Sequence, residues 1–513
     1  MMNVQNDNNE LPKSPEPYWR QSVDLPSFEK LTHDIEAEVC IVGGGITGIT
    51  TAYELTQAGV KVVLIDADHL LNGTTGHTTA KLTAQHGIIY DEFINHFGVE
   101  KTKLYYEAST DAIHYVKNLV SQKRIECDFK TQDAIIYSIS DADDQKVRKE
   151  YAAYERLGIP NELKNSIPFS IETQSVLAMK EQAQFHPLQY LNTLLTEIVN
   201  NGGQIFEHTV AVDVEETPEL KVITKEGPKI KCNYIVAASH FPFYDAKGFY
   251  FSRMYAERSY VLAAKIDAPY PGGMYYSSDS PKRSLRSVTI KGQEYVLISG
   301  DGHKTGQGKN TKEHYEALQT FGEQVLGMKE IAYRWSAQDL YTLDKMPYIG
   351  HITENSPRIL IATGYRKWGM TNGTFAATLL KDIILENDNK YKELFSPSRF
   401  VADPSLKKFI TTNFDVAGHL IEGKLERPTR EIKDLKLDEG AVVTVNGERA
   451  GAYKDEQGNV YCVDTTCTHM KCELEWNDGE RSWDCPCHGS RFSVKGEVLE
   501  GPADKPLKQI NVN

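Results

Sequence analysis

Two absences narrow the functions open to this 513-residue chain. No apolar run approaches the roughly 20 residues that cross a bilayer, so we expect no membrane span. Lysine and arginine number 57 against 71 aspartates and glutamates, a net charge of −14. This shortage of positive charge disfavours nucleic acid and anionic membranes as partners. The first residues also lack the basic-then-apolar order of a signal peptide, so we expect a cytoplasmic protein.

Cysteine is scarce except in one segment. Three cysteines are scattered (Cys40, Cys127 and Cys232), whereas the other five lie close together near the C-terminal end (Cys462, Cys467, Cys472, Cys485 and Cys487). A secreted disulfide scaffold spreads its cysteines, while a cluster in a cytosolic chain more often holds a metal. We expect each scattered cysteine to be a small buried apolar residue.

The sequence also has no internal repeats or low-complexity tracts, so we assign its regions from local changes in composition and hydrophobic pattern. Its hydrophobic fraction of 40% and its length suit about three globular domains. Four regions follow: a polar arm at 1–35, a mixed α/β region at 36–395, a linker at 396–429 and a small β region at 430–513. The linker carries apolar residues at helical spacing from Leu406 to Ile421, and the last region has short strands and glycine turns.

The region after the arm begins with a strand, a glycine-rich turn and a helix. Glu38–Val42 is apolar enough to be a buried strand, and Gly43-x-Gly45-x-x-Gly48 follows it directly. A helical spacing then ends at Gly59, and a second strand at Val60–Ile65 ends in Asp66. Glycines at such a turn let a pyrophosphate approach backbone N–H groups, while an acid at the second strand's end can bind ribose. This unit predicts a bound dinucleotide.

Helices and strands alternate irregularly through the rest of the mixed region. Helical patterns are expected at 91–120, 151–157 and 188–199, and strands at 134–139, 260–264, 294–299 and 358–362. The mixture indicates a nucleotide-binding domain interleaved with a substrate domain. A second glycine-rich segment, Gly300–Gly306, has the wrong spacing for a dinucleotide and no apolar-faced helix directly after it. We interpret it as a substrate-domain loop or hairpin and expect no NAD site.

A further strand leads through glycines into a helix at Ile361–Gly373, which aims N–H groups and a positive helix end at an electron-rich group. With the loop Gly73–Thr79 and the stretch Leu343–Gly350, these segments resemble the FAD-dependent D-amino-acid oxidase/glycine oxidase superfamily over about residues 35–390. The resemblance implies that FAD is the dinucleotide. It also implies a set of cofactor-binding residues: Gly43, Gly45, Ile46, Thr47, Gly48, Asp66, Thr74, Thr75, Val210, Gly364, Trp368, Gly369, Met370 and Thr371.

The cysteine-rich segment contains two similar loops. Cys467-Thr-His469-Met-Lys-Cys472 is followed by Cys485-Pro-Cys487-His488-Gly-Ser490. One cysteine and one histidine from each loop suit a [2Fe–2S] centre with cysteines on one iron and histidines on the other. Zinc is the alternative, although zinc ligands usually pair like with like within a loop.

Both loops, with Gly501-Pro502-Ala503 after them, resemble the Rieske family. The resemblance implies that Cys467 and Cys485 bind one iron and that His469 and His488 bind the other. It further implies a disulfide between Cys472 and Cys487, as in cytochrome-complex Rieske proteins. One position departs from that class: Phe492 stands where a tyrosine is usual, so one hydroxyl donor to a sulfur is missing.

Together the resemblances imply an α/β FAD-binding Rossmann-like domain interleaved with an α+β substrate domain, then a small all-β Rieske domain. We expect an FAD-dependent oxidoreductase that oxidises an amine or amino acid and passes electrons through the cluster to an external acceptor. Candidate substrate contacts are Arg283, Arg286, Tyr341 and Lys367, and no catalytic residue is assigned. The alternative is a non-catalytic electron carrier or redox sensor. A ring-hydroxylating oxygenase would need a mononuclear iron domain, whose place the flavin fold occupies.

Overall fold

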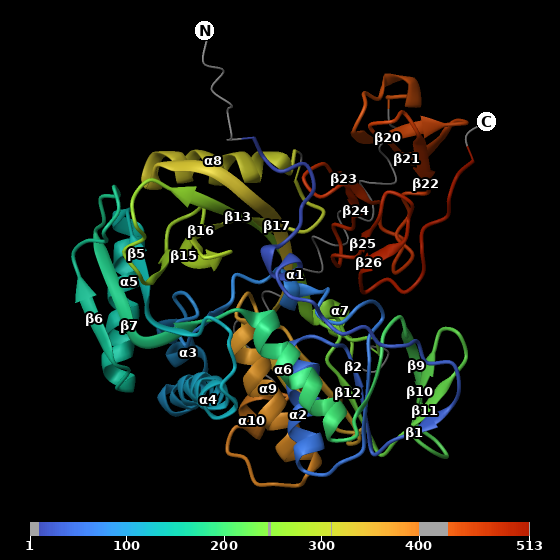
Figure 1. The fold of residues 1–513 in the computed structure, drawn as a ribbon, viewed down its shortest axis with the longest axis horizontal. Coiled ribbons are helices and arrows are strands. Elements are labelled where there is room, and N and C mark those ends of the chain that lie inside the picture. Colours follow the sequence, from blue (N-terminus) through green and yellow to red (C-terminus); the bar gives the residue numbers. More distant parts are fainter. Residues whose placement is uncertain (1–9, 245–247, 309, 400–428, 512–513) are drawn as a thin grey trace.

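The computed structural model describes residues 10–244, 248–308, 310–399 and 429–511, and Figure 1 shows how they are arranged. The dinucleotide-binding and substrate regions interleave along the chain, and the C-terminal β region (orange to red) lies against them. The helix predicted from Leu406 to Ile421 lies outside the described residues. Among those residues, no helix is long and apolar enough to cross a membrane.

The dinucleotide-binding sheet has the strand order β18-β19-β12-β2-β3-β8. β2, β3, β8, β12 and β19 are parallel, and β18 pairs antiparallel with β19 at the edge. The strands are β2 (Val39–Val42), β3 (Val62–Ile65), β8 (Gln204–Phe206), β12 (Tyr234–Ala237), β18 (Tyr348–His351) and β19 (Ile359–Thr363). Because the central strands are buried on both faces, their sequences are continuous apolar runs.

Helices cover this sheet and complete the main core. They are α2 (Ile46–Gln57), α6 (Pro187–Asn200), α9 (Gly369–Ile384) and α10 (Lys392–Phe395), with the short α1 (Tyr18–Gln21) and η1 (Thr74–His77) nearby. Helix α2 packs on both α6 and α9. The predicted strand–turn–helix–strand unit is therefore confirmed as β2–α2–β3, with the parallel pairing that a doubly wound sheet requires.

A smaller sheet lies beside it, in the order β1-β11-β10-β9. Its strands are β1 (Ile35–Glu36), β9 (Ala211–Glu215), β10 (Lys221–Thr224) and β11 (Lys229–Lys231). Val210, one of the residues expected to bind FAD, directly precedes β9, so this sheet fixes its position.

The substrate region is built on a large, mostly antiparallel sheet in the order β17-β13-β16-β15-β14-β5-β7-β4, with β6 paired to β7. Its strands are β4 (Lys81–Leu82), β5 (Lys130–Ser138), β6 (Asn161–Lys164), β7 (Ser175–Gln184), β13 (Met254–Ile266), β14 (Met274–Ser277), β15 (Arg283–Ile290), β16 (Gln293–Lys304) and β17 (Met328–Thr342). Gly300 and Gly302 lie inside β16, so the second glycine-rich segment belongs to a strand of this sheet.

The helices of this region are α3 (Tyr90–Phe97), α4 (Val99–Lys123), α5 (Asp141–Leu157), α7 (Tyr250–Arg253) and α8 (Lys312–Leu326). The single helix expected at 91–120 is wrong in one respect: it is two helices that meet at Gly98. The φ of Gly98 is +82°, which no residue inside an α-helix adopts, so the chain changes direction there.

The C-terminal region contains two small antiparallel sheets, β20-β21-β22 and β23-β24-β25-β26. The elements are η2 (Ile432–Asp434), β20 (Glu439–Val445), β21 (Glu448–Lys454), β22 (Val460–Val463), β23 (Glu475–Asn477), β24 (Ser482–Asp484), β25 (Arg491–Phe492) and β26 (Val498–Glu500). Both cysteine-containing loops pack into the core of the second sheet, around Trp483 and Phe492. The expected α/β, α+β and small all-β organisation is present.

Candidate functional site

A cavity of about 2050 Å³ extends along the dinucleotide-binding domain and reaches the C-terminal domain. Most residues expected to bind FAD line it: Gly43, Gly45, Ile46, Thr47, Asp66, Thr74, Thr75, Val210, Trp368, Gly369 and Met370. Residues Glu497–Ala503 of the C-terminal domain line the same cavity. The two predicted redox regions therefore border one continuous space.

The glycine-rich turn has the geometry that a close backbone approach requires. The φ of Gly43 is +113°, and a Cβ there would lie 2.5 Å from the Ala238 carbonyl oxygen. A Cβ on Gly48 would lie only 1.9 Å from the Gly43 carbonyl oxygen. Each glycine is thus needed for the turn itself, and the N-terminal end of α2 faces the cavity, as a pyrophosphate site requires.

Asp66 stands at the end of β3 and braces the same turn. Its carboxylate accepts hydrogen bonds from the Gly44 and Asp68 backbone N–H groups, at 2.6 and 2.9 Å. Burial raises the pKa of Asp66 to about 6, although these hydrogen bonds oppose that shift. The carboxylate lines the cavity, where a ribose hydroxyl would be within its reach.

Three of the residues expected to contact FAD do not line the cavity. Gly48 packs against Gly43, and Gly364 (φ +77°) packs against Thr342. The Thr371 hydroxyl donates to the Thr83 carbonyl at 2.8 Å and accepts from the Thr83 N–H at 3.0 Å. In the structure these residues shape the two turns from behind, a supporting role that sequence spacing alone cannot distinguish from direct contact.

Threonine hydroxyls link the two turns. The Thr75 hydroxyl accepts from the Ile46 N–H at 3.0 Å, at the beginning of α2, and the Thr47 and Tyr365 hydroxyls are 2.9 Å apart. The loop at Thr74 and Thr75, the α2 terminus and the segment before α9 are therefore connected. The resemblance predicts that the first of these turns binds the ADP part of FAD and that the second lies against the flavin ring.

Several cavity groups were not singled out from the sequence. Asp339 on β17 accepts from the Lys367 N–H at 3.1 Å, and burial raises the Asp339 pKa to about 6. Lys81 donates to the Tyr275 carbonyl at 3.0 Å and to the Ser284 hydroxyl, and burial lowers its pKa to about 7. Lys81 could have been found from the sequence, because it closely follows the Gly73–Thr79 loop. No pattern in the sequence points to Asp339.

The candidate substrate contacts divide into two groups. Tyr341, Lys367 and Arg283 line the cavity, with Lys367 Nζ 3.6 Å from Glu257 and Arg283 paired with Asp301 at 2.8 Å. Arg286 does not line the cavity: it is buried, donates to the Ala80 carbonyl and lies over the Trp19 ring. Aromatic rings complete this end of the cavity, where Trp368 stacks on His86 at a centroid distance of 5.1 Å.

The predicted metal ligands meet at the tips of two loops. The Cys467 and Cys485 thiols are hydrogen-bonded to each other, and the His469 and His488 rings are 5.1 Å apart. The hydrogen bond between the two thiols is the largest effect on both: it lowers the pKa of Cys467 and raises the pKa of Cys485, so Cys467 ionises first. Burial lowers the pKa of both histidines. Thiolates and neutral imidazoles are the forms that bind iron.

The atoms left without partners fit a cluster at this position. The Nδ1 atoms of His469 and His488 are buried and have no hydrogen-bond partner, which is costly unless a metal takes their lone pairs. Cys472 and Cys487 form a disulfide with an S–S distance of 2.05 Å, so the implied pairing is confirmed. Cys467 and Cys485 stay free beside it, as ligands must.

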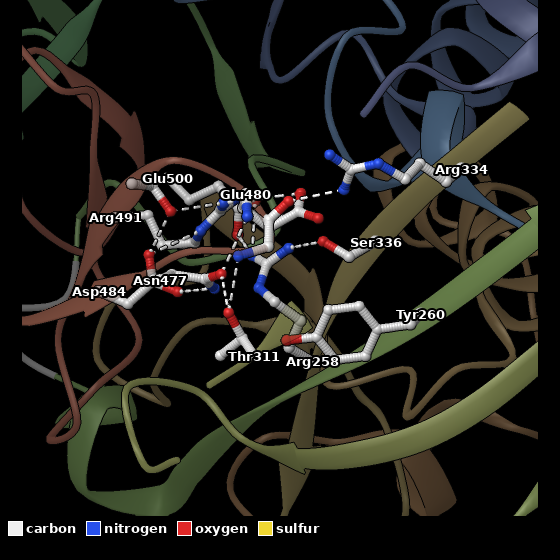
Figure 2. A network of polar contacts seen from close by, with 12 residues as sticks. Arg258, Tyr260, Thr311, Arg334, Ser336, Asn477, Glu480, Asp484, Arg491 and Glu500 are labelled. Atoms are coloured by element: carbon white, nitrogen blue, oxygen red, sulfur yellow. Dashed lines mark hydrogen bonds and ion pairs between the residues drawn. The ribbon is translucent and has the colours of Figure 1, made fainter. Parts of the chain in front are cut away.

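Buried charges join the C-terminal domain to the substrate sheet (Figure 2). Arg258 on β13 donates to Glu500 on β26 at 3.0 Å and to the Ser336 hydroxyl at 2.6 Å. Arg491 donates to Glu500 at 2.7 Å and to Asp484 at 3.1 Å. Burial would raise the pKa of Glu500, but the charges of Arg258 and Arg491 outweigh it and lower the pKa to about 2.

Comparison with known proteins agrees with this geometry. The family model for FAD dependent oxidoreductases (DAO) matches residues 38–383, and the model for the Rieske [2Fe-2S] domain matches residues 427–511. The chain belongs to the DAO family of FAD-dependent oxidoreductases and carries a C-terminal Rieske domain. It is therefore an enzyme of the oxidoreductase class whose cofactors are FAD and a [2Fe–2S] cluster.

One relative is similar over nearly the whole chain, and others are similar over about 70% of it. YhfW of Bacillus subtilis (strain 168), whose name describes a Rieske 2Fe-2S iron-sulfur protein, is 53% identical over 98% of both chains. Gamma-glutamylputrescine oxidoreductase of Escherichia coli (strain K12) is 22% identical over 70% of this chain and 85% of its own. Glycine oxidase from Geobacillus kaustophilus has a similar fold, with a TM-score of 0.61 and 15% identity over 72% of this chain and 100% of its own.

Phe492 should lower the reduction potential of the cluster. It is buried in the same core as Cys467 and Cys485, and Ser490 is hydrogen-bonded to the Cys467 thiol. A hydroxyl that donates to a sulfur stabilises the reduced cluster. We expect Phe492→Tyr to raise the midpoint potential by roughly several tens of millivolts, where about 59 mV is tenfold for one electron.

Voltammetry of the full-length holoprotein measures this shift, and Ser490→Ala is the matched control that should move the midpoint downward. Trp483 lies opposite Phe492 in the β24–β25 pair and has a buried indole N–H without a partner. If the new hydroxyl bonded to that group instead, Phe492→Tyr would leave the midpoint unchanged, and the explanation through a sulfur donor would be wrong.

Proposed function

We propose that the protein oxidises a small amine or amino acid and passes the electrons singly to an external one-electron acceptor through its Rieske cluster. The observation that carries this proposal is the shared cavity, which residues of the FAD-binding turns and residues Glu497–Ala503 of the Rieske domain line together. When bound, FAD accepts an electron pair as a hydride, and the cluster carries one electron at a time.

The reaction balances with a single named co-reactant. The substrate C–H bond breaks as a hydride leaves, the amine nitrogen gives up a proton, and the C=N bond of an imine forms. The two electrons reduce two molecules of a one-electron acceptor, and two protons are released to solvent for each amine oxidised. Names of relatives favour an amine: the E. coli relative is named for gamma-glutamylputrescine, and the structural neighbour is a glycine oxidase.

The proposed FAD contacts line the cavity or lie behind its turns, whereas the proposed cluster ligands lie in the two cysteine-containing loops of the Rieske domain. Gly43, Gly45, Ile46, Thr47 and Asp66 would hold the adenosine diphosphate part. The cluster would be held by Cys467, His469, Cys485 and His488. Gly48, Gly364 and Thr371 would support the turns. The remaining proposed FAD contacts are Thr74, Thr75, Val210, Trp368, Gly369 and Met370.

Groups at the aromatic end of the cavity are suited to a polar substrate. Glu257 and Asp339 offer carboxylates to an ammonium group, and Lys367 offers a cation to a carboxylate. Lys81, with a pKa of about 7, can hold or release a proton near neutral pH. We further propose that the reaction takes place in the cytoplasm, because Cys40, Cys127, Cys232 and Cys462 are all unpaired.

Anaerobic mixing of the holoprotein with a panel of amines and amino acids tests the function. A substrate should bleach the flavin absorption first and then produce the electron paramagnetic resonance signal of the reduced cluster. A flavin that responds while the cluster stays oxidised would contradict the proposed route. No response to any compound in a broad panel would favour the alternative of an electron carrier or redox sensor.

A further inference from the structure

The loop that carries His488 lies directly on the substrate sheet. Gly489 has a φ of +81°, and a Cβ there would lie 2.5 Å from the Ala256 Cβ on β13. On the other side, a Cβ on Gly306 would lie 2.4 Å from the Pro486 nitrogen. The loop, residues Cys485–Ser490, therefore packs closely against β13 and the segment at Gly306.

Gln338 is hydrogen-bonded to both predicted cofactor loops. Its side-chain Nε2 donates to the Gly489 carbonyl at 3.0 Å, and its backbone carbonyl accepts from the Thr74 hydroxyl at 3.2 Å. Thr74 lines the cavity in the predicted flavin loop, and Gly489 directly follows the predicted ligand His488. The side chain is 2% exposed, so water cannot replace either bond easily.

Other hydrogen bonds also join the two domains. Thr311 donates to Asn477 at 2.5 Å and to Asp478 at 2.6 Å, and Arg334 donates to the Gly479 carbonyl at 2.7 Å. Arg258 adds its bond to Glu500 (Figure 2). Because adhesion between the domains is distributed over these residues, the placement of Gln338 between the two loops points to a more local role.

We propose that Gln338 is a positioning residue that fixes the cluster loop against the flavin loop and thereby sets the rate of electron transfer between them. This inference rests on the proposed function. The residue connects the two loops, because its backbone carbonyl accepts from Thr74 and its side-chain amide donates to Gly489, the residue after His488. Electron transfer weakens steeply as such a connection lengthens or breaks, so a loop displaced by a small distance transfers electrons more slowly.

Gln338→Met tests the proposal, because methionine keeps the length of the side chain and loses the amide donor. Amide hydrogen exchange in Cys485–Ser490 should become about fivefold faster, the factor that corresponds to one hydrogen bond of about 1 kcal/mol. After flash reduction of the flavin by a 5-deazaflavin radical, transfer to the cluster should slow on the order of tenfold. Both midpoint potentials should stay as in the wild type.

The control is Thr311→Val, which removes the interdomain hydrogen bonds to Asn477, Asp478 and Gly479 and leaves the Gln338 bond to the cluster loop in place. It should leave exchange in Cys485–Ser490 and the transfer rate unchanged. If Gln338→Met loads both cofactors and matches the wild type in exchange and rate, the role of Gln338 is refuted. If the Gln338→Met protein loses its cofactors, Gln338→Glu is the second variant. Its carboxylate would face the Gly489 carbonyl, so the increase in amide exchange and the decrease in transfer rate should both be larger. Wild-type values of exchange and rate in that variant would again refute the role.

The two proposals fail in different ways. If wild-type flavin and cluster exchange no electrons after the flash, the proposed function is wrong, whatever the variants do. If wild-type transfer is fast and the Gln338→Met protein transfers equally fast, only the role of Gln338 is wrong.

Discussion

Replacing Arg258 with methionine should lower the free energy of unfolding by about 3 kcal/mol. Arg258 is 1% exposed, and its guanidinium contacts Glu500 across the domain interface and Ser336 within the substrate sheet. Removing one partner of a buried ion pair typically costs about 3–5 kcal/mol, because the other charge is left without compensation. We expect the low end of that range, since Arg491 still donates to Glu500 at 2.7 Å.

Urea unfolding at pH 7 measures this cost, with the visible absorption of the cluster reporting the Rieske domain. Arg148→Met is the matched control, because Arg148 pairs with Asp144 at 2.8 Å on an exposed helix surface, where its side chain is 57% exposed. That pair should contribute only about 0.2–0.5 kcal/mol. Equal losses in the two variants would show that the Arg258–Glu500 contact has no special weight.

The Arg258–Glu500 ion pair determines the direction in which the free energy of unfolding should change with pH. The pKa of Glu500 is lowered from 4.5 to about 2 in the folded protein, so the folded state stabilises the ionised form. Its contribution is fully present above pH 4.5 and is lost as the pH falls from about 4.5 to about 2. The stability difference between wild type and Arg258→Met should therefore narrow over that range.

Local patterns in the sequence predict those elements whose important residues lie close together along the chain. The β2–α2–β3 unit and both cysteine–histidine loops lie within short segments, and a buried parallel strand leaves a continuous apolar run. The Cys472–Cys487 disulfide came from the resemblance and not from the local pattern, because three further cysteines of the segment could have competed for it. The domain boundaries at 395 and 430 stay predictions.

The interface could not be predicted in the same way. Arg258 and Glu500 are 242 residues apart, and each alone is typical of a solvated charge. Gln338 gives no local signal either, because its partners Thr74 and Gly489 come from two distant loops. Which of the predicted FAD residues line the cavity also depended on packing: Thr371 bonds to Thr83, 288 residues away. Such contacts depend on how the domains pack, and no periodic pattern in the sequence indicates them.

Gly48→Ala should abolish tight FAD binding and leave the Rieske centre intact. A Cβ at Gly48 would lie 1.9 Å from the Gly43 carbonyl oxygen. Gly43 cannot move away, since its own φ of +113° and its contact with Ala238 already fix the turn. We expect FAD affinity to fall on the order of 100-fold, which corresponds to about 2.7 kcal/mol.

The direction of the change caused by Gly48→Ala distinguishes a steric clash at the turn from an effect of helix propensity. Alanine in a helix interior is normally about 0.8–1.0 kcal/mol more favourable than glycine, so without the clash Gly48→Ala would stabilise α2. Titration of the flavin-free protein with FAD, followed by fluorescence quenching, gives the affinity, and the cluster spectrum reports the Rieske domain. Gln57→Ala, at an exposed position of the same helix, should bind FAD like the wild type. Wild-type affinity in the Gly48→Ala protein would mean that the turn at Gly43 does not hold the dinucleotide.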